Sequence, residues 1–141
     1  MKVGCPKEIK AQEFRVGLTP AAVNELVRRG HFVTIETNAG QGAGFVDSDY
    51  EKEGADIVGS AKEVFDKADM IVKVKEPQAI ERKMLKSGQL LFTYLHLAPD
   101  PEQTHDLIDS GCTAIAYETV TDLNGGLPLL APMSEVAGRL A

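Results

Sequence analysis

The stretch MIVKV at residues 70–74 and the stretch LLFTYL at residues 90–95 are short runs dominated by β-branched, aromatic and other apolar side chains. Such runs are typical of strands that are covered on both faces, as in a parallel sheet. Further strands are predicted at the start of the chain (MKVGC), over HFVTIE (31–36) and over TAIAYE (113–118). Together these runs predict a sheet built from short, largely buried strands.

Helix signals separate the predicted strands. A capping residue begins a helix in three places, which are Thr19-Pro20, Ser60 with Glu63, and Asp100-Pro101 with Gln103. Gly30 and Gly111 are suited to end the first and the last of these helices, because glycine tolerates the left-handed conformation. Alternating strands and helices predict an α/β fold with an open, mainly parallel sheet and helices on both faces, flavodoxin-like or Rossmann-like.

The last ten residues, PMSEVAGRLA (132–141), predict the opening of a helix, with Ser134 as a possible cap. No stop signal follows, so we expect a truncated α/β domain. Residues 1–131 would form a substrate-binding or catalytic domain, and residues 132–141 would begin a helix leading to a domain absent from the chain. The alternative is that these ten residues are a short frayed tail.

Composition narrows the classes of function. A hydrophobic fraction of 43% and a charged fraction of 26% are typical of a globular protein, and the formal charge of −6 disfavours nucleic acids as partners. We find neither a bilayer-spanning run nor a signal peptide, so we expect a cytoplasmic protein with no membrane partner. Cys5 and Cys112 lack CxxC spacing, so we expect neither a metal site nor a disulfide.

Three side chains that can carry chemistry follow predicted strands. Arg15 lies in the loop after the first strand, Lys75 follows MIVKV, and His96 follows LLFTYL. Ligands of open parallel sheets bind at the carboxyl ends of the strands. Arginine grips a carboxylate, lysine polarises a carbonyl, and histidine transfers protons near neutral pH. The pattern therefore predicts a site for a small oxo acid or amino acid.

Each of these residues alone is more often a solvated or structural side chain, and only their coincidence at strand ends favours a site. His31 and His105 we interpret as structural. The glycine-rich segment NAGQGAGF (38–45) lacks GxGxxG spacing, and acidic residues follow it, so a flexible loop is predicted. The chain contains no nucleotide-binding fingerprint.

Five segments, in order and spacing, resemble the N-terminal region of alanine dehydrogenases over essentially all 141 residues. They are MKVGCPKEIKAQEFRVGLTP, AGQGAGFVDSDYEKEGA, VKVKEP, LLFTYLHLA and PLLAPMSEVAGR. KEP followed by YLHLA is the most specific part. The alpha subunit of proton-translocating transhydrogenase shares the RVGLTP-like segment, but that family does not keep the Lys and His pair.

The resemblance implies oxidative deamination of L-alanine to pyruvate and ammonium with NAD. It implies that Arg15 and Lys75 bind the carboxylate and carbonyl of the substrate, that His96 is the catalytic acid and base, and that Ser134 contacts the cofactor. Tyr94 and Met133 are expected as pocket walls, with ordinary core packing as their alternative.

The resemblance also implies that a domain absent from this chain binds most of the NAD, and that a C-terminal helix returning from the missing part covers apolar surface of this one. We expect a hexamer for the full-length protein and no turnover by the isolated chain. Two other functions stay open. The chain could belong to a transhydrogenase subunit, or it could be a non-catalytic ligand-binding module.

Overall fold

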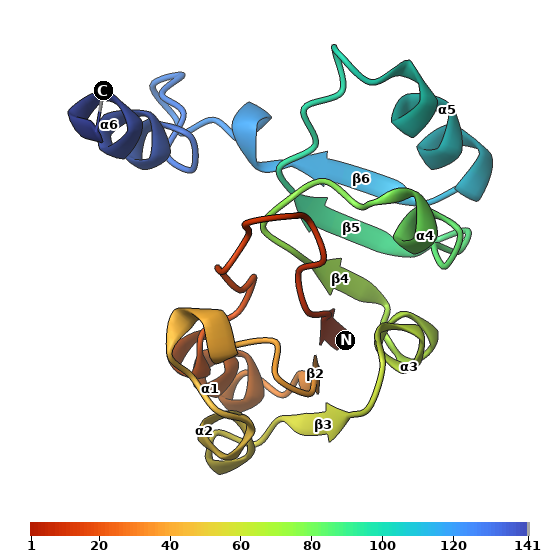
Figure 1. Cartoon of the computed structure of the whole chain (residues 1–141), viewed down its shortest axis with the longest axis vertical. Coiled ribbons are helices and arrows are strands. Elements are labelled where there is room, and N and C mark those ends of the chain that lie inside the picture. The colour runs from red at the N-terminus through yellow and green to blue at the C-terminus, as the bar shows by residue number, and fades with distance from the viewer. Residues whose placement is uncertain (141) are drawn as a thin grey trace.

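The computed structural model describes residues 1–140, and side chains up to residue 139. Its centre is a sheet of six strands, all parallel, in the order β3-β2-β1-β4-β5-β6 (Figure 1). The strands are β1 (Lys2–Cys5), β2 (Phe32–Glu36), β3 (Asp56–Val58), β4 (Met70–Val72), β5 (Leu90–Thr93) and β6 (Thr113–Ala116). The predicted α/β fold is confirmed, and the strand order is that of Rossmann-like domains.

Six helices and two short 3-10 turns connect the strands. The helices are α1 (Pro20–Arg28), α2 (Asp47–Lys52), α3 (Ala61–Lys67), α4 (Ala79–Arg82), α5 (Pro101–Ser110) and α6 (Ala131–Leu140), and the turns are η1 (Gln41–Ala43) and η2 (Tyr117–Thr119). The side chains of Thr19, Ser60 and Asp100 accept hydrogen bonds from backbone amides in the first turns of α1, α3 and α5. All three predicted caps are therefore present.

The helices divide between the two faces of the sheet at the place where the strand order reverses. Helices α1 and α2 lie on one side in Figure 1, and α3, α4 and α5 lie on the other. Each side has its own core. The first packs Val23 and Tyr50 against β1 and β2, and the second packs Val64, Phe65 and Leu107 against β4 and β5. The reversal lies between β1 and β4, so the loops after these two strands leave in opposite directions.

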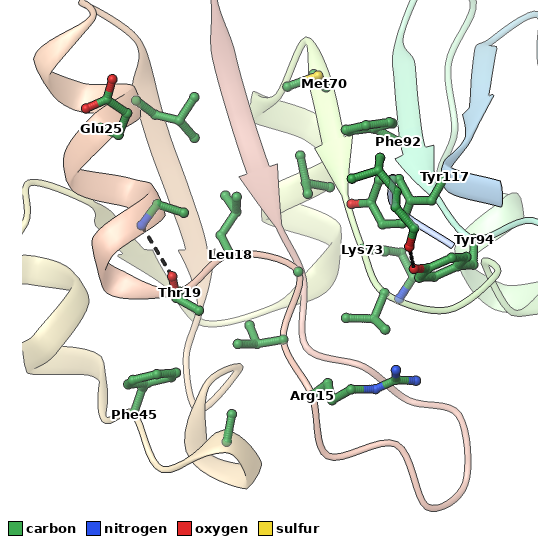
Figure 2. A pocket seen from close by; sticks show the side chains of 18 of the residues that line it. Arg15, Leu18, Thr19, Glu25, Phe45, Met70, Lys73, Phe92, Tyr94 and Tyr117 are labelled. Carbon is green, nitrogen blue, oxygen red and sulfur yellow. Dashed lines mark hydrogen bonds between the residues drawn. The ribbon is translucent and has the colours of Figure 1, made fainter. Parts of the chain in front are cut away.

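The face that carries α1 and α2 is hollowed beside β4 and β5. An apolar hollow of about 730 Å³ opens there, between α1 and the strands. Figure 2 shows Phe92, Tyr94 and Tyr117 on one wall and Glu25 with Thr19 on the other. We predicted apolar surface of this kind from the resemblance, and the described residues leave it open.

Three local predictions need correction. Helix α6 begins at Ala131, and the amide of Ser134 donates to the carbonyl of Leu130 at 3.1 Å, so Ser134 lies inside the first turn and does not cap it. The glycine-rich segment contains the 3-10 turn η1, which ends at Gly44 with a φ of 87°. Finally, β3 and α4 were not predicted, because Asp56–Val58 and Ala79–Arg82 contain neither a long apolar run nor a helical spacing of apolar residues.

Candidate active site

The carboxyl ends of the strands surround a second, more polar hollow of about 350 Å³. Five of the six predicted site residues line it: Arg15, Lys75, Tyr94, His96 and Met133. Lys10, Glu76, Glu118 and Leu130 complete its wall. The sixth, Ser134, is exposed in the next position of α6 and does not line it. The volume suits a small organic acid, and the lining comes from the loops after β1, β4, β5 and β6.

Arg15 comes from the loop between β1 and α1, which spans residues 6–19. Its guanidinium is already paired, since Nε and Nη2 donate to the two carboxylate oxygens of Glu13 at 2.8 and 2.5 Å. The bidentate pair holds the pKa of Glu13 below its ordinary value. The side chain of Arg15 is 43% exposed, and its Nη1 contacts the sulfur of Met133 at 3.8 Å. Arg15 therefore offers an oriented cation at the rim of the hollow.

Lys75 is held by its backbone. Its amide hydrogen points at a carboxylate oxygen of Glu8 at 3.3 Å, and its carbonyl accepts a hydrogen bond from the buried hydroxyl of Thr93 at 2.8 Å. Among residues 1–140, no carboxylate forms an ion pair with the ammonium of Lys75, whereas Lys10 pairs with Glu76 and Arg15 with Glu13. Lys75 is thus the cation of this hollow whose charge is left for a ligand.

A buried ion triad lies beneath Lys75. The ammonium of Lys73 contacts Glu8 at 3.0 Å and Glu81 at 2.7 Å, and the three side chains are 0%, 2% and 1% exposed. Glu8 also accepts the amide of Val74 at 2.7 Å. Glu8 belongs to the loop after β1, Lys73 follows β4 directly, and Glu81 lies in α4. The triad therefore ties together the two loops that diverge at the switch point.

The charges of the triad compensate one another. Burial alone lowers the pKa of Lys73, but the nearby carboxylates of Glu81 and Glu8 outweigh burial and raise the pKa above its ordinary value. Burial raises the pKa of Glu81, and the ammonium of Lys73 opposes that shift. The lysine therefore stays charged, and its charge is what makes two buried carboxylates tolerable.

His96 follows β5 in an unusual backbone conformation. Its φ is 51°, in the left-handed region that few residues other than glycine adopt. The carboxylate of Glu118 accepts the amide of His96 at 2.6 Å and that of Leu95 at 3.1 Å. On the other side of the same peptide, the buried amide group of Gln103 donates to the carbonyl of Leu95 at 2.6 Å. The backbone that carries the imidazole is therefore fixed from two elements.

Tyr94 and Met133 line the polar hollow and also the apolar hollow shown in Figure 2. The ring of Tyr94 packs edge-on against Tyr117, with ring centroids 4.9 Å apart, and its hydroxyl donates to the carbonyl of Leu129. Tyr94 therefore connects β5 to the segment that leads into α6. Their predicted role as the walls of a substrate pocket stays a prediction.

The described residues do not form a cradle for the pyrophosphate of a dinucleotide. The connection from β1 to α1 is a loop of fourteen residues rather than a tight glycine-rich turn. At the first turn of α1, the hydroxyl of Thr19 already accepts the amide of Ala22. Added bulk at Gly17 would meet the carbonyl of Val72 at 2.7 Å, so this glycine serves close packing of the loop on β4. The β1–α1 connection therefore lacks the tight glycine-rich turn that holds a pyrophosphate in dinucleotide-binding domains.

The residues that support the site were not predicted from the sequence. These are Glu8, Glu13, Lys73, Glu81, Gln103 and Glu118. Two signals were available in the sequence: Glu13 lies two residues from Arg15, and Lys73 interrupts an apolar run. Glu81 and Glu118 lie too far along the chain from their partners for any spacing rule to connect them.

Within residues 1–140 there is no cluster of metal-ligating side chains. None of the helices described is both long and apolar enough to cross a bilayer. His31 and His105 lie outside the polar hollow, as their structural interpretation requires.

The strand order defines a Rossmann-like α/β domain with a polar hollow, lined by Arg15, Lys75 and His96, at the carboxyl ends of its strands. Comparison with known proteins gives the family. The chain belongs to the alanine dehydrogenase/PNT N-terminal domain family, whose model matches residues 4–137.

Among its relatives, the alanine dehydrogenase of Halomonas elongata is 57% identical over all 141 residues. A solved structure of an L-alanine dehydrogenase is 58% identical over 99% of the chain, with a TM-score of 0.95. The transhydrogenase from Sinorhizobium meliloti is more distant, at 30% identity over 87% of the chain and a TM-score of 0.81. The chain spans 38%, 38% and 36% of the lengths of these three proteins.

Proposed function

We propose that this chain is the substrate-binding part of an alanine dehydrogenase. The observation that carries the proposal is the convergence of Arg15, Lys75 and His96 on one small hollow from three separate loops. The high identity to alanine dehydrogenases supports the same substrate pair, L-alanine and pyruvate. The reaction converts L-alanine, NAD⁺ and water to pyruvate, ammonium, NADH and one proton.

The chain's own residues would bind the acid and move a proton. Arg15, at the rim, would face the carboxylate of the substrate, exchanging part of its contact with Glu13. The unpaired ammonium of Lys75 would polarise the carbonyl oxygen of pyruvate. His96 would accept a proton as alanine is oxidised and return it in the reverse direction. No step of the hydride transfer is assigned to the described residues.

Two observations favour this function over a transhydrogenase subunit. Identity to the alanine dehydrogenases is almost twice the identity to the transhydrogenase. In addition, hydride exchange between two nucleotides requires neither a group that polarises a carbonyl nor a general acid and base. Lys75 and His96, which could supply both, line the same small hollow. A non-catalytic binding module would have no use for the histidine.

The remaining parts of the proposal follow from the resemblance to alanine dehydrogenases. NAD would bind mainly to residues outside this chain, and Ser134, exposed in the first turn of α6, would contact it. The full-length protein would be a cytoplasmic homo-oligomer, and a hexamer in particular. The isolated chain would not catalyse the reaction.

The test is NADH oxidation by the full-length protein with pyruvate and ammonium, comparing wild type with His96→Ala and His105→Ala. We expect turnover that falls by about 10²–10⁴-fold in His96→Ala, the usual contribution of a general acid or base. His105→Ala, a histidine outside the hollow, should retain wild-type rates. Absence of turnover in the wild type, or an active His96→Ala, would contradict the proposal.

A further inference from the structure

Glu118 is the one acidic side chain on the polar hollow that is engaged by backbone amides rather than by a cation. Its Oε1 accepts the amides of Leu95 and His96 at 3.1 and 2.6 Å, and its Oε2 lies 3.2 Å from the amide of Leu95. Two successive amides that converge on one anion form a small concave anion site in the backbone. Here the anion is supplied by the protein itself, from a residue 22 positions further along the chain.

This contact is coupled to the left-handed conformation of His96. The amides of Leu95 and His96 both donate to Glu118, and the chain then continues through His96 with a φ of 51°. A residue other than glycine is uncommon in this region and is held there by its surroundings. Gln103, fully buried in α5, fixes the opposite edge of the segment through the carbonyl of Leu95.

We infer that Glu118 is a positioning residue for catalysis: its carboxylate fixes the peptide between Leu95 and His96, from which the left-handed His96 places its imidazole at the hollow. The inference rests on the proposed function, because it assigns to His96 the proton transfer described above. Glu118 acts through His96 and is not itself given a contact with the substrate. Loss of the carboxylate frees the turn to relax, and a displaced acid or base transfers protons slowly even though it is still present.

Kinetics on the full-length protein separate positioning from simple structural support. We expect Glu118→Ala to lower kcat by about 10- to 100-fold with little change in KM for pyruvate, as for a misplaced catalytic group. Glu118→Gln keeps an acceptor oxygen for the two amides and should recover most of the loss. Glu51→Ala, an exposed glutamate on α2, is the matched control and should retain wild-type kinetics.

A double-mutant cycle supplies the decisive readout. If Glu118 acts through His96, removing Glu118 from a His96→Ala background should change kcat by less than about twofold, although the same change is costly in the wild type. Hydrogen exchange gives a readout independent of activity. The amides of Leu95 and His96 should exchange faster in Glu118→Ala, while those of β1 keep their protection.

The possible failures are distinguishable. An inactive wild type overturns the proposed function. The inference about catalysis, which rests on that function, is then overturned as well. If the wild type is active, any of three results overturns the inference alone. These are an unchanged kcat in Glu118→Ala, an effect of Glu118→Ala that adds in full to that of His96→Ala, and unchanged exchange rates of the Leu95 and His96 amides. A rise in KM with kcat unaltered would likewise overturn it, since that result marks direct substrate binding.

Discussion

Replacement of Lys73 by methionine is the most demanding test of the buried ion triad. Methionine fills a similar volume but removes the only positive charge from between Glu8 and Glu81, both almost fully buried. Breaking a buried pair in this way costs about 3–5 kcal/mol, because it leaves buried charge without compensation. A domain of this kind is stable by about 5–15 kcal/mol, so the variant should lose a large part of its stability.

The loss should depend on pH. Burial already raises the pKa of Glu81, and without the ammonium of Lys73 that pKa rises further. A carboxyl group with a raised pKa binds protons more tightly in the folded state, so it destabilises the fold above that pKa and ceases to do so as the pH falls. The cost of Lys73→Met should therefore be smaller at about pH 5 than at about pH 8.

Urea unfolding followed by far-ultraviolet circular dichroism measures this cost, since the chain has no tryptophan. The triple variant Lys73→Met, Glu8→Gln, Glu81→Gln removes the whole charge system and should be more stable than Lys73→Met alone. Lys62→Met, which breaks an exposed pair with Asp66, should cost less than about 1 kcal/mol. A loss below about 1 kcal/mol for Lys73→Met, or a loss equal at both pH values, would refute the reasoning.

Two further predictions concern Tyr94 and Cys5. Tyr94→Phe removes the hydrogen bond to the carbonyl of Leu129, which is worth about 1 kcal/mol. A protease should therefore cleave residues 121–133 faster in this variant. The control Tyr50→Phe loses a similar hydrogen bond to the carbonyl of Leu18 and should leave that cleavage rate unchanged. Burial raises the pKa of the Cys5 thiol from 9.0 to about 12, so its contribution to stability is complete below about pH 9 and is lost as the pH rises toward 12. The melting temperature of Cys5→Ala should therefore fall less steeply above pH 9 than that of the wild type, and equal slopes would contradict this assignment.

The sequence was sufficient for the architecture because its signals are local. A helix cap at Thr19 or Asp100 involves residues three apart, and a buried strand such as LLFTYL shows its character within six residues. The fold predicted from these signals is confirmed. The short elements β3 and α4 escaped prediction because contacts with the rest of the fold, rather than their own pattern, stabilise them.

The residues of the candidate site were likewise predictable only where their signals are local. Arg15, Lys75 and His96 could be found because each follows a strand and the ends of parallel strands meet. Their supports could not be found, since Glu8 meets Lys73 across 65 positions and Glu118 meets His96 across 22. Ser134 shows the limit of local signals, because a serine near a helix start resembles a cap even where the helix begins three residues earlier.

The pairing of Arg15 with Glu13 has a consequence for how the hollow is filled. An anchor that already holds a carboxylate does not gain an ion pair when an acid arrives; it trades one partner for another. Its contribution to affinity is therefore the difference between two similar contacts, and the departing acid is replaced at once by the glutamate. In the proposed function, such an exchange would shorten the residence of the bound acid, so that a product would leave as readily as a substrate enters.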